Sequence, residues 1–210
     1  MSSVLNVSAL NVSGSGKLGG ICGFASTVGA LFENGLLGES AVKSLDKAHL
    51  NTRVLATIVT YLRILKSENN QQYLNEIIKF TQAFPGYETF SIDAYITKIE
   101  SVVSDPSNIN QDFSIAMPPN PVADFIRRNG LKTVLIRGST PALKSNVILG
   151  LGDGTKTDKW DGLKHWVYCN HGGTIYNYGE AYGSDQAISK MADFFPGTSW
   201  SVVYQMPLEK

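Results

Sequence analysis

From Leu163 to Tyr178 the chain reads LKHWVYCNHGGTIYNY, in which two apolar, aromatic-rich segments flank a short polar stretch. Segments 163–169 and 174–178 are typical of β-strands, and the Asn-His-Gly-Gly stretch between them is a strong turn signal. The sequence therefore predicts a β-hairpin here, and with it an antiparallel sheet.

The two faces of this hairpin differ in chemistry, because side chains alternate along a strand. Matching the apolar sides of the two strands puts the aromatic residues on one face, as cross-strand neighbours. The other face then holds His165, Val167, Cys169, Ile175 and Asn177. This register needs a loop of odd length, for example three residues with a glycine in the left-handed conformation, which Gly172-Gly173 permits.

His165 and Asn177 stand roughly opposite one another in this register. An amide oxygen bonded to one imidazole nitrogen fixes the tautomer, so that the other nitrogen can face a thiol. A loop of even length would turn Asn177 to the wrong face. The third partner of the histidine would then be Glu180, Asp185 or no residue at all.

The rest of the chain changes from a helical to a β pattern near Lys132. Strands are predicted at 132–137, 146–151 and 199–205 besides the hairpin, with a helix at 184–194 before the last strand. Earlier, helices are predicted from Cys22, at 51–66, at 71–83, after the cap Ser91, and from Asn120-Pro121 to Gly130. Helices followed by strands with short connections predict an α+β fold with an antiparallel sheet.

The predicted organisation is one domain. Residues 1–18 form a flexible Ser/Asn/Gly-rich leader, and residues 19–210 form the domain, with a helical half at about 19–130 and a sheet half at about 131–210. The loop at 152–162 is polar and long enough to bind a substrate or act as a lid, so Trp160, Asp161 and Gly162 are candidate substrate-binding residues.

Cys22 is the second candidate for chemistry. A glycine-rich run ends at this residue, and Cys22, Ala25, Val28, Gly29 and Phe32 follow at helical spacing, so the cysteine is predicted to open a helix. The unpaired amides and positive dipole end of a helix N-terminus favour a thiolate. The alternative is a buried, inert structural cysteine.

The composition excludes several classes of function. Eighteen basic residues balance eighteen acidic ones without a dense cationic block, which argues against nucleic acid as a partner. No apolar run approaches the length of a membrane span, and the N-terminus lacks the pattern of a secretory signal. Two cysteines are too few for a disulfide scaffold, so both are predicted to be free thiols.

No metal or cofactor is predicted. The glycine-rich segments lack the spacing of a phosphate or dinucleotide loop. Cys169 with His165 and His171 lacks a fourth zinc ligand, and the aspartates of loop 152–162 lack the spacing of a calcium loop.

Cys22-Gly23 at a helix start, His165 on a strand and Asn177 on the next strand together resemble the papain-like cysteine peptidase superfamily. Segment 163–179 looks most like its bacterial branches, the bacteriocin-processing type of peptidase and the injected effector proteases or deamidases. The resemblance implies a catalytic triad of Cys22, His165 and Asn177 that acts on a protein or peptide. It also implies a bacterial effector or toxin, exported without a classical signal peptide into a host or rival cell.

The superfamily usually supplies a glutamine several residues before the cysteine as an oxyanion donor, and residues 11–17 contain none. Ser15, Lys17 or Asn11 could substitute, with the backbone amide of Cys22 as the other donor. The same triad would serve a protease, a Gln/Asn deamidase or a peptidoglycan amidase. A non-catalytic binding or structural protein with this fold is the alternative outside the enzyme class.

Overall fold

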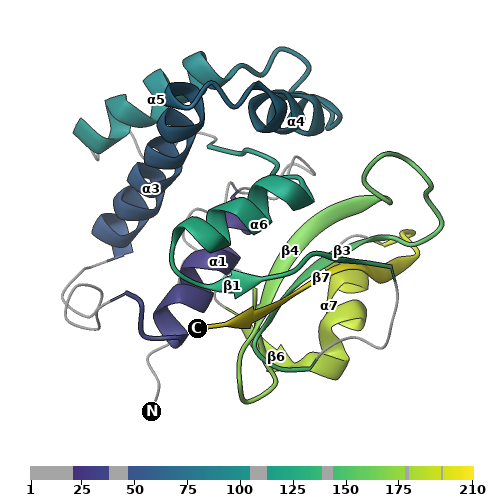
Figure 1. Cartoon of the computed structure of the whole chain (residues 1–210). Coiled ribbons are helices and arrows are strands. Elements are labelled where there is room, and N and C mark those ends of the chain that lie inside the picture. Colours follow the sequence, from purple (N-terminus) through teal and green to yellow (C-terminus); the bar gives the residue numbers. More distant parts are fainter. Residues whose placement is uncertain (1–20, 38–46, 105–112, 139–143, 178–179, 195) are drawn as a thin grey trace.

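The computed structural model describes residues 21–37, 47–104, 113–138, 144–177, 180–194 and 196–210, and helices precede strands along the chain (Figure 1). The helices of the first part are α1 (Cys22–Glu33), α3 (Lys47–Ser67), α4 (Gln71–Gln82), α5 (Ile92–Ser104) and α6 (Pro119–Arg128). The predicted α+β class is confirmed.

The strands of the described residues form one seven-stranded antiparallel sheet. They are β1 (Lys132–Thr133), β2 (Ile136–Arg137), β3 (Val147–Asp153), β4 (Leu163–Cys169), β5 (Thr174–Asn177), β6 (Glu180–Gly183) and β7 (Trp200–Glu209). Their order across the sheet is β1-β7-β3-β4-β5-β6, and β2 also pairs with β7. A 3₁₀ turn (Ser184–Gln186) and α7 (Ala187–Phe194) connect β6 to β7.

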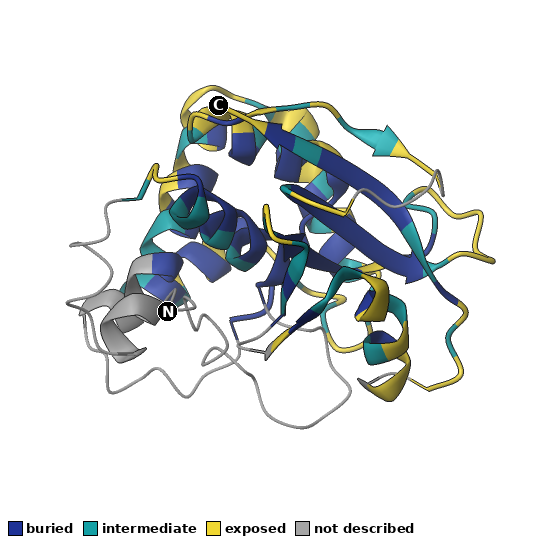
Figure 2. Ribbon diagram, turned by 90° about the horizontal axis from the view of Figure 1, so that it is seen from below, coloured by how far each residue is buried: buried dark blue, intermediate teal, exposed yellow. Residues whose placement is uncertain are grey.

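Helix α1 lies in the middle of the molecule, between the sheet and helices α3 and α6, while α7 packs on the other side of the sheet (Figure 1). Residues of β4 alternate between these two layers. Trp166 and Tyr168 belong to the large core that contains α1, whereas Val167 and Cys169 pack with Met191 of α7. The buried residues form a continuous centre in Figure 2.

The central position of α1 explains why its predicted apolar face is incomplete. Phe24, Thr27, Ala30 and Leu31, outside that face, are also buried. The ring of Phe24 contacts Phe125 of α6 at a centroid distance of 4.9 Å and Tyr61 of α3 at 6.0 Å. A helix enclosed on most sides cannot show a clean amphipathic pattern.

Several predicted boundaries were wrong. The single strand expected at 132–137 is divided into β1 and β2, and β6 was missed because glycine flanks a very short edge strand that forms only by pairing with β5. Asn120 is not a helix cap, since α6 begins at Pro119 after the extended Pro118. Prolines are tolerated there because the first amides of a helix have no intrahelical acceptor.

A β-bulge lies beside His165. Leu151 pairs with His165, but the next residue, Gly152, pairs with Leu163, which leaves Lys164 without a cross-strand partner. Leu163 and Trp166 consequently both lie in the α1 core. His165, paired with Leu151 of the layer that faces α7, therefore lies on the side of the sheet opposite to Trp166 and α1.

Gly152→Ala is expected to lower the free energy of unfolding by about 2 kcal/mol, because overpacked sites cannot relax without moving backbone. A Cβ at Gly152 would lie 2.3 Å from the carbonyl oxygen of Gly162, a main-chain atom. Gly29→Ala is the matched control, since its Cβ would make only an ordinary contact of 3.9 Å with Tyr168. Urea denaturation measures both variants, and equal stability of the two would contradict the account.

Candidate functional site

The β4–β5 hairpin has the predicted odd-length loop. Cys169 pairs with Ile175, and Asn170 N donates to Thr174 O at 2.9 Å. Three residues remain in the turn, of which Gly173 has a φ of +75°. The even-length alternative, and with it Glu180 or Asp185 as the partner of His165, is excluded.

His165 and Asn177 are joined directly, with 2.7 Å between His165 Nε2 and Asn177 Oδ1. Continuing the register places Asn177 across from Val167, so the histidine and asparagine are diagonal neighbours rather than directly opposite. An amide oxygen only accepts hydrogen bonds, so Nε2 carries the proton and Nδ1 is the basic nitrogen. The structure thus brings together two of the three residues predicted to act as a triad.

The environment of His165 keeps it neutral. Its side chain is almost fully buried, with 4 % exposed. Burial lowers the pKa of His165 to about 4, and the hydrogen bond that His165 donates to Asn177 opposes this shift only in part. At neutral pH the ring is therefore an imidazole, the form that accepts a proton.

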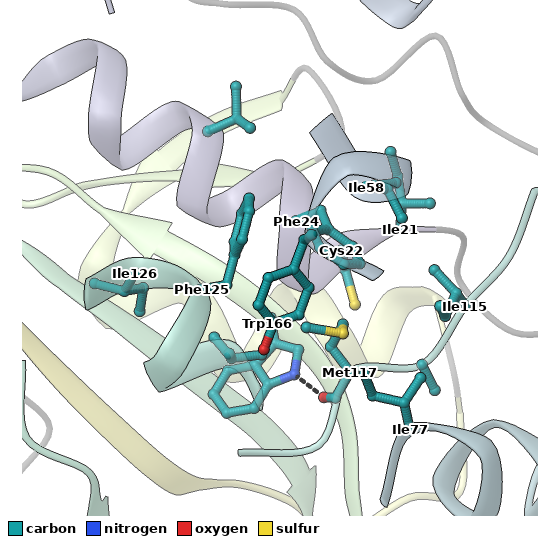
Figure 3. Packing of buried hydrophobic residues seen from close by; sticks show 14 of the residues in the cluster. Ile21, Cys22, Phe24, Ile58, Ile77, Ile115, Met117, Phe125, Ile126 and Trp166 are labelled. Carbon is teal, nitrogen blue, oxygen red and sulfur yellow. Dashed lines mark hydrogen bonds between the residues drawn. The ribbon is translucent and has the colours of Figure 1, made fainter. Parts of the chain in front are cut away.

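Cys22 is the first residue of α1, as predicted. The preceding Ile21 provides no side-chain cap, and no acidic residue lies in the first turn. The helix terminus favours the thiolate form. Against this, Cys22 is only 9 % exposed and packs with apolar side chains such as Met117 and Ile115, which favour the thiol (Figure 3).

One stripe of α1 lies along β4. Ser26 Oγ donates to the carbonyl oxygen of Trp166 at 3.0 Å, and the Cβ position of Gly29 is 3.9 Å from Tyr168 Cδ1. Cys22 is on the same stripe, one turn before Ser26. Cys22 therefore lies level with the start of β4, but His165 pairs with Leu151 and points, with Asn177, to the other side of the sheet, which faces α7.

An extended, buried segment covers this end of α1. Trp166 Nε1 donates to Met117 O at 2.8 Å, and Thr81 Oγ1 accepts from Ala116 N at 3.1 Å. Met117 packs so closely on the helix start that a Cβ at Gly23 would be 2.8 Å from Met117 Cβ. Figure 3 shows Met117 beside Cys22 and Trp166. Spacing along the sequence gave no signal for these contacts.

The predicted substrate-binding residues all have structural contacts. The ring of Trp160 packs on Phe80 of α4 at 4.8 Å, and Asp161 binds Arg137 through two hydrogen bonds and accepts from Tyr204 Oη. The backbone of Gly162 has a φ of +69° and bonds Asp153 N through its carbonyl. These contacts fix loop 152–162 to the sheet and to α4. Substrate binding by Trp160, Asp161 and Gly162 stays a prediction.

Of the proposed oxyanion donors, Ser15, Lys17 and Asn11 lie outside the described residues, as does the predicted leader. The amide of Cys22 lies at the start of α1. It remains the one candidate donor that can be placed.

Cys169 differs sharply from Cys22. It is fully buried in the sheet layer facing α7, and burial raises the pKa of its thiol to about 11. Both cysteines are free thiols, as predicted. Among the described residues no cluster of three or more His, Cys, Asp or Glu side chains could hold a metal ion.

Comparisons with protein-family models, curated proteins and solved structures found no match. No helix in the described residues is long and apolar enough to cross a membrane.

Proposed function

We propose that the chain is a thiol hydrolase that cleaves amide bonds through Cys22, His165 and Asn177. The observation that carries this proposal is the 2.7 Å hydrogen bond between the buried His165 and Asn177 side chains. Helix α1, which begins at Cys22, packs on β4 from the side opposite to the His165 side chain. The buried imidazole presents its basic nitrogen, and a helix terminus holds the thiol.

The proposed reaction has two stages. His165 Nδ1 takes the thiol proton while Cys22 Sγ attacks the amide carbonyl carbon. The tetrahedral intermediate collapses, the C–N bond breaks, and the imidazolium returns the proton to the departing amine. Water then attacks the thioester with Nδ1 as base, releasing the carboxylic acid and the free thiol. Asn177 holds the ring in one tautomer throughout.

The oxyanion of each tetrahedral intermediate would lie near the N-terminus of α1. The backbone amide of Cys22 is the proposed donor there, and the positive end of the helix dipole adds to it. No metal or cofactor is needed for this chemistry.

A protein or peptide is the proposed substrate, and the proposed setting is a bacterial effector or toxin, both by the resemblance to papain-like enzymes. Hydrolysis of a main-chain amide would make the enzyme a protease, and hydrolysis of a Gln or Asn side chain a deamidase. A peptidoglycan cross-bridge would make it an amidase.

A product assay tests the activity and separates these reactions. Wild-type protein and Cys22→Ala are each incubated with a mixture of unstructured polypeptides and, separately, with peptidoglycan. New amino termini indicate a protease, and ammonia without chain cleavage indicates a deamidase. We expect one of these products from the wild type and none from Cys22→Ala. Equal yields from both proteins would contradict the role of Cys22.

A binding or structural protein without catalysis is the second candidate, and one observation favours it. Cys22 is 9 % exposed and lies beneath Met117, which is itself 1 % exposed. A cysteine sealed in apolar surroundings is inert. Under this alternative we expect Cys22 to resist alkylation as strongly as the fully buried Cys169.

A further inference from the structure

His165 and Asn177 lie on the side of the sheet that α7 covers. His165 pairs with Leu151, and Asn177 falls across from Val167. Both of these partners belong to the apolar layer that contains Met191 of α7, whereas the α1 core lies on the opposite side of the sheet. Cross-strand partners share a face, so a titratable ring and its amide partner are buried between the sheet and this layer.

The path of α7 crosses this side of the sheet from the hairpin turn toward His165. The helix follows Gly183, which pairs with Thr174 beside the turn. The chain returns to the sheet at Trp200, which pairs with Asp153, two residues after the partner of His165. Figure 1 shows α7 against this side, away from α1.

Helix α7 is a short element with few described contacts to the sheet. It has eight residues, and among its described side chains Ala187 and Met191 are buried and Ile188 is partly buried against the layer. Ala192 and Asp193 are exposed. A helix this short is not stable by itself in water. Because few buried apolar contacts mark a region that opens at low cost, α7 can leave the sheet while the α1 core stays folded.

Other titratable residues belong to the elements around His165. They are Lys164 and Cys169 on β4, Asp153 on β3, Glu180 and Tyr182 on β6, Asp185 in the 3₁₀ turn, and Lys190 and Asp193 on α7. Lys164 Nζ donates to Thr198 Oγ1 at 3.2 Å, and the Lys190 and Asp193 side chains are 4.0 Å apart. Carboxyl groups ordinarily titrate at about pH 4, and thiols, lysine and tyrosine above about pH 8, whereas an exposed histidine gains its charge between about pH 7.5 and 5.

Opening of α7 would change the environment of His165 from apolar to aqueous. Burial lowers its pKa to about 4 from the ordinary 6.5, and access of water returns the pKa toward 6.5. The opened form therefore binds a proton that the closed form does not, so acid favours opening. With these two pKa values the ratio of opened to closed molecules rises about 30-fold from pH 7.5 to pH 5.

We propose that α7 is an acid-released cover, which leaves the sheet when His165 takes up a proton and uncovers the apolar layer beneath it. That layer includes Leu149, Val167 and Ile175. Neither Cys22 nor an amide substrate takes part, so this device is independent of the proposed function.

The two cysteines provide the test, because they lie on opposite sides of the sheet. Cys169 belongs to the layer under α7, and Cys22 belongs to the α1 core. The rate of modification of each thiol by 4,4′-dithiodipyridine, which reacts in acid as well as at neutral pH, is measured by peptide mass from pH 7.5 to 4.5. Each rate is divided by that of the urea-unfolded chain at the same pH. His165→Gln is the control that cannot titrate, and Met191→Ala loosens α7 without changing His165.

In the wild type we expect the relative rate of Cys169 to rise about 30-fold from pH 7.5 to pH 5, while that of Cys22 stays constant. Met191→Ala should raise the Cys169 rate at every pH and keep the rise in acid, and His165→Gln should abolish that rise. A constant Cys169 rate in the wild type, or an equal rise for both cysteines, would overturn the proposal. An unchanged rise in His165→Gln would overturn it as well.

Discussion

Replacing His165 by alanine is expected to lower the rate of acyl transfer to Cys22 by about 10²–10⁴-fold, the usual contribution of a positioned base. The reason is that His165 Nδ1 takes the thiol proton, while Nε2 is held by Asn177. p-Nitrophenyl acetate measures this step without knowledge of the natural substrate. Acylation of Cys22 should release one nitrophenolate per chain in a fast phase, which Cys22→Ala should lack.

His171→Ala is the matched control, because His171 lies in the turn of the same hairpin and contacts Asn34 rather than Asn177. It should keep the fast phase. His165→Ala also leaves a buried amide without its partner, so circular dichroism must show that the variant is folded. A folded His165→Ala with the wild-type rate would contradict the role of His165 as base.

Acidification from pH 6.5 to pH 4 is expected to remove about 3 kcal/mol from the free energy of unfolding. Burial lowers the pKa of His165 to about 4 from its ordinary 6.5. Below pH 6.5 the unfolded chain therefore binds a proton that the folded chain does not. The contribution of the neutral His165 to the free energy of unfolding is therefore complete above pH 6.5, and it is lost as the pH falls to about 4. Urea denaturation at a series of pH values measures it.

His165→Gln is the control, because glutamine does not titrate and its amide can still bond Asn177. In this variant the free energy of unfolding should no longer change between pH 6.5 and pH 4.5. Arg137 lowers the pKa of Asp161, and Thr155 lowers the pKa of Asp153. The contributions of these two carboxylates to the free energy of unfolding are therefore lost only below their ordinary pKa of 3.8. A wild-type curve flat from pH 6.5 to 4.5 would show that His165 is not buried as described.

The sequence was sufficient where local chemistry decides the structure. The start of α1 at Cys22 and the full extent of β4 were predicted, since a glycine run, helical spacing and strand alternation are local signals. The hairpin register was predicted from face matching together with Gly172-Gly173. That register led to the His165–Asn177 pair, which the structure confirms.

The contacts that surround Cys22 could not be predicted, because they depend on segments far apart in the chain. Met117 and Trp166 meet only through the packing of an extended segment across α1. The bond from Ser26 to Trp166 depends on where β5 leaves β4, which no spacing in the sequence encodes. The bulge at Lys164 likewise arises from the pairing of β3 with β4.

Loop 152–162 shows the limit of a local signal, because substrate binding by this loop stays a prediction. Its glycines and polar residues suggested a lid, but Asp161 binds Arg137 and Tyr204, and Trp160 packs on Phe80. Polar residues in a loop can bind neighbouring elements as readily as a ligand, and only the fold decides between these roles.

Cys22 and His165 are proposed to form a nucleophile–base pair, and this pair would show in the pH dependence of Cys22 alkylation. The rate is measured by intact mass in wild type and His165→Ala, with the buried Cys169 as internal reference. The account predicts that Cys22 reacts fast well below the ordinary thiol pKa of about 8.5, that this rate is lost with His165, and that Cys169 stays unlabelled. Slow labelling of Cys22 that follows an ordinary thiol and ignores His165 would contradict it.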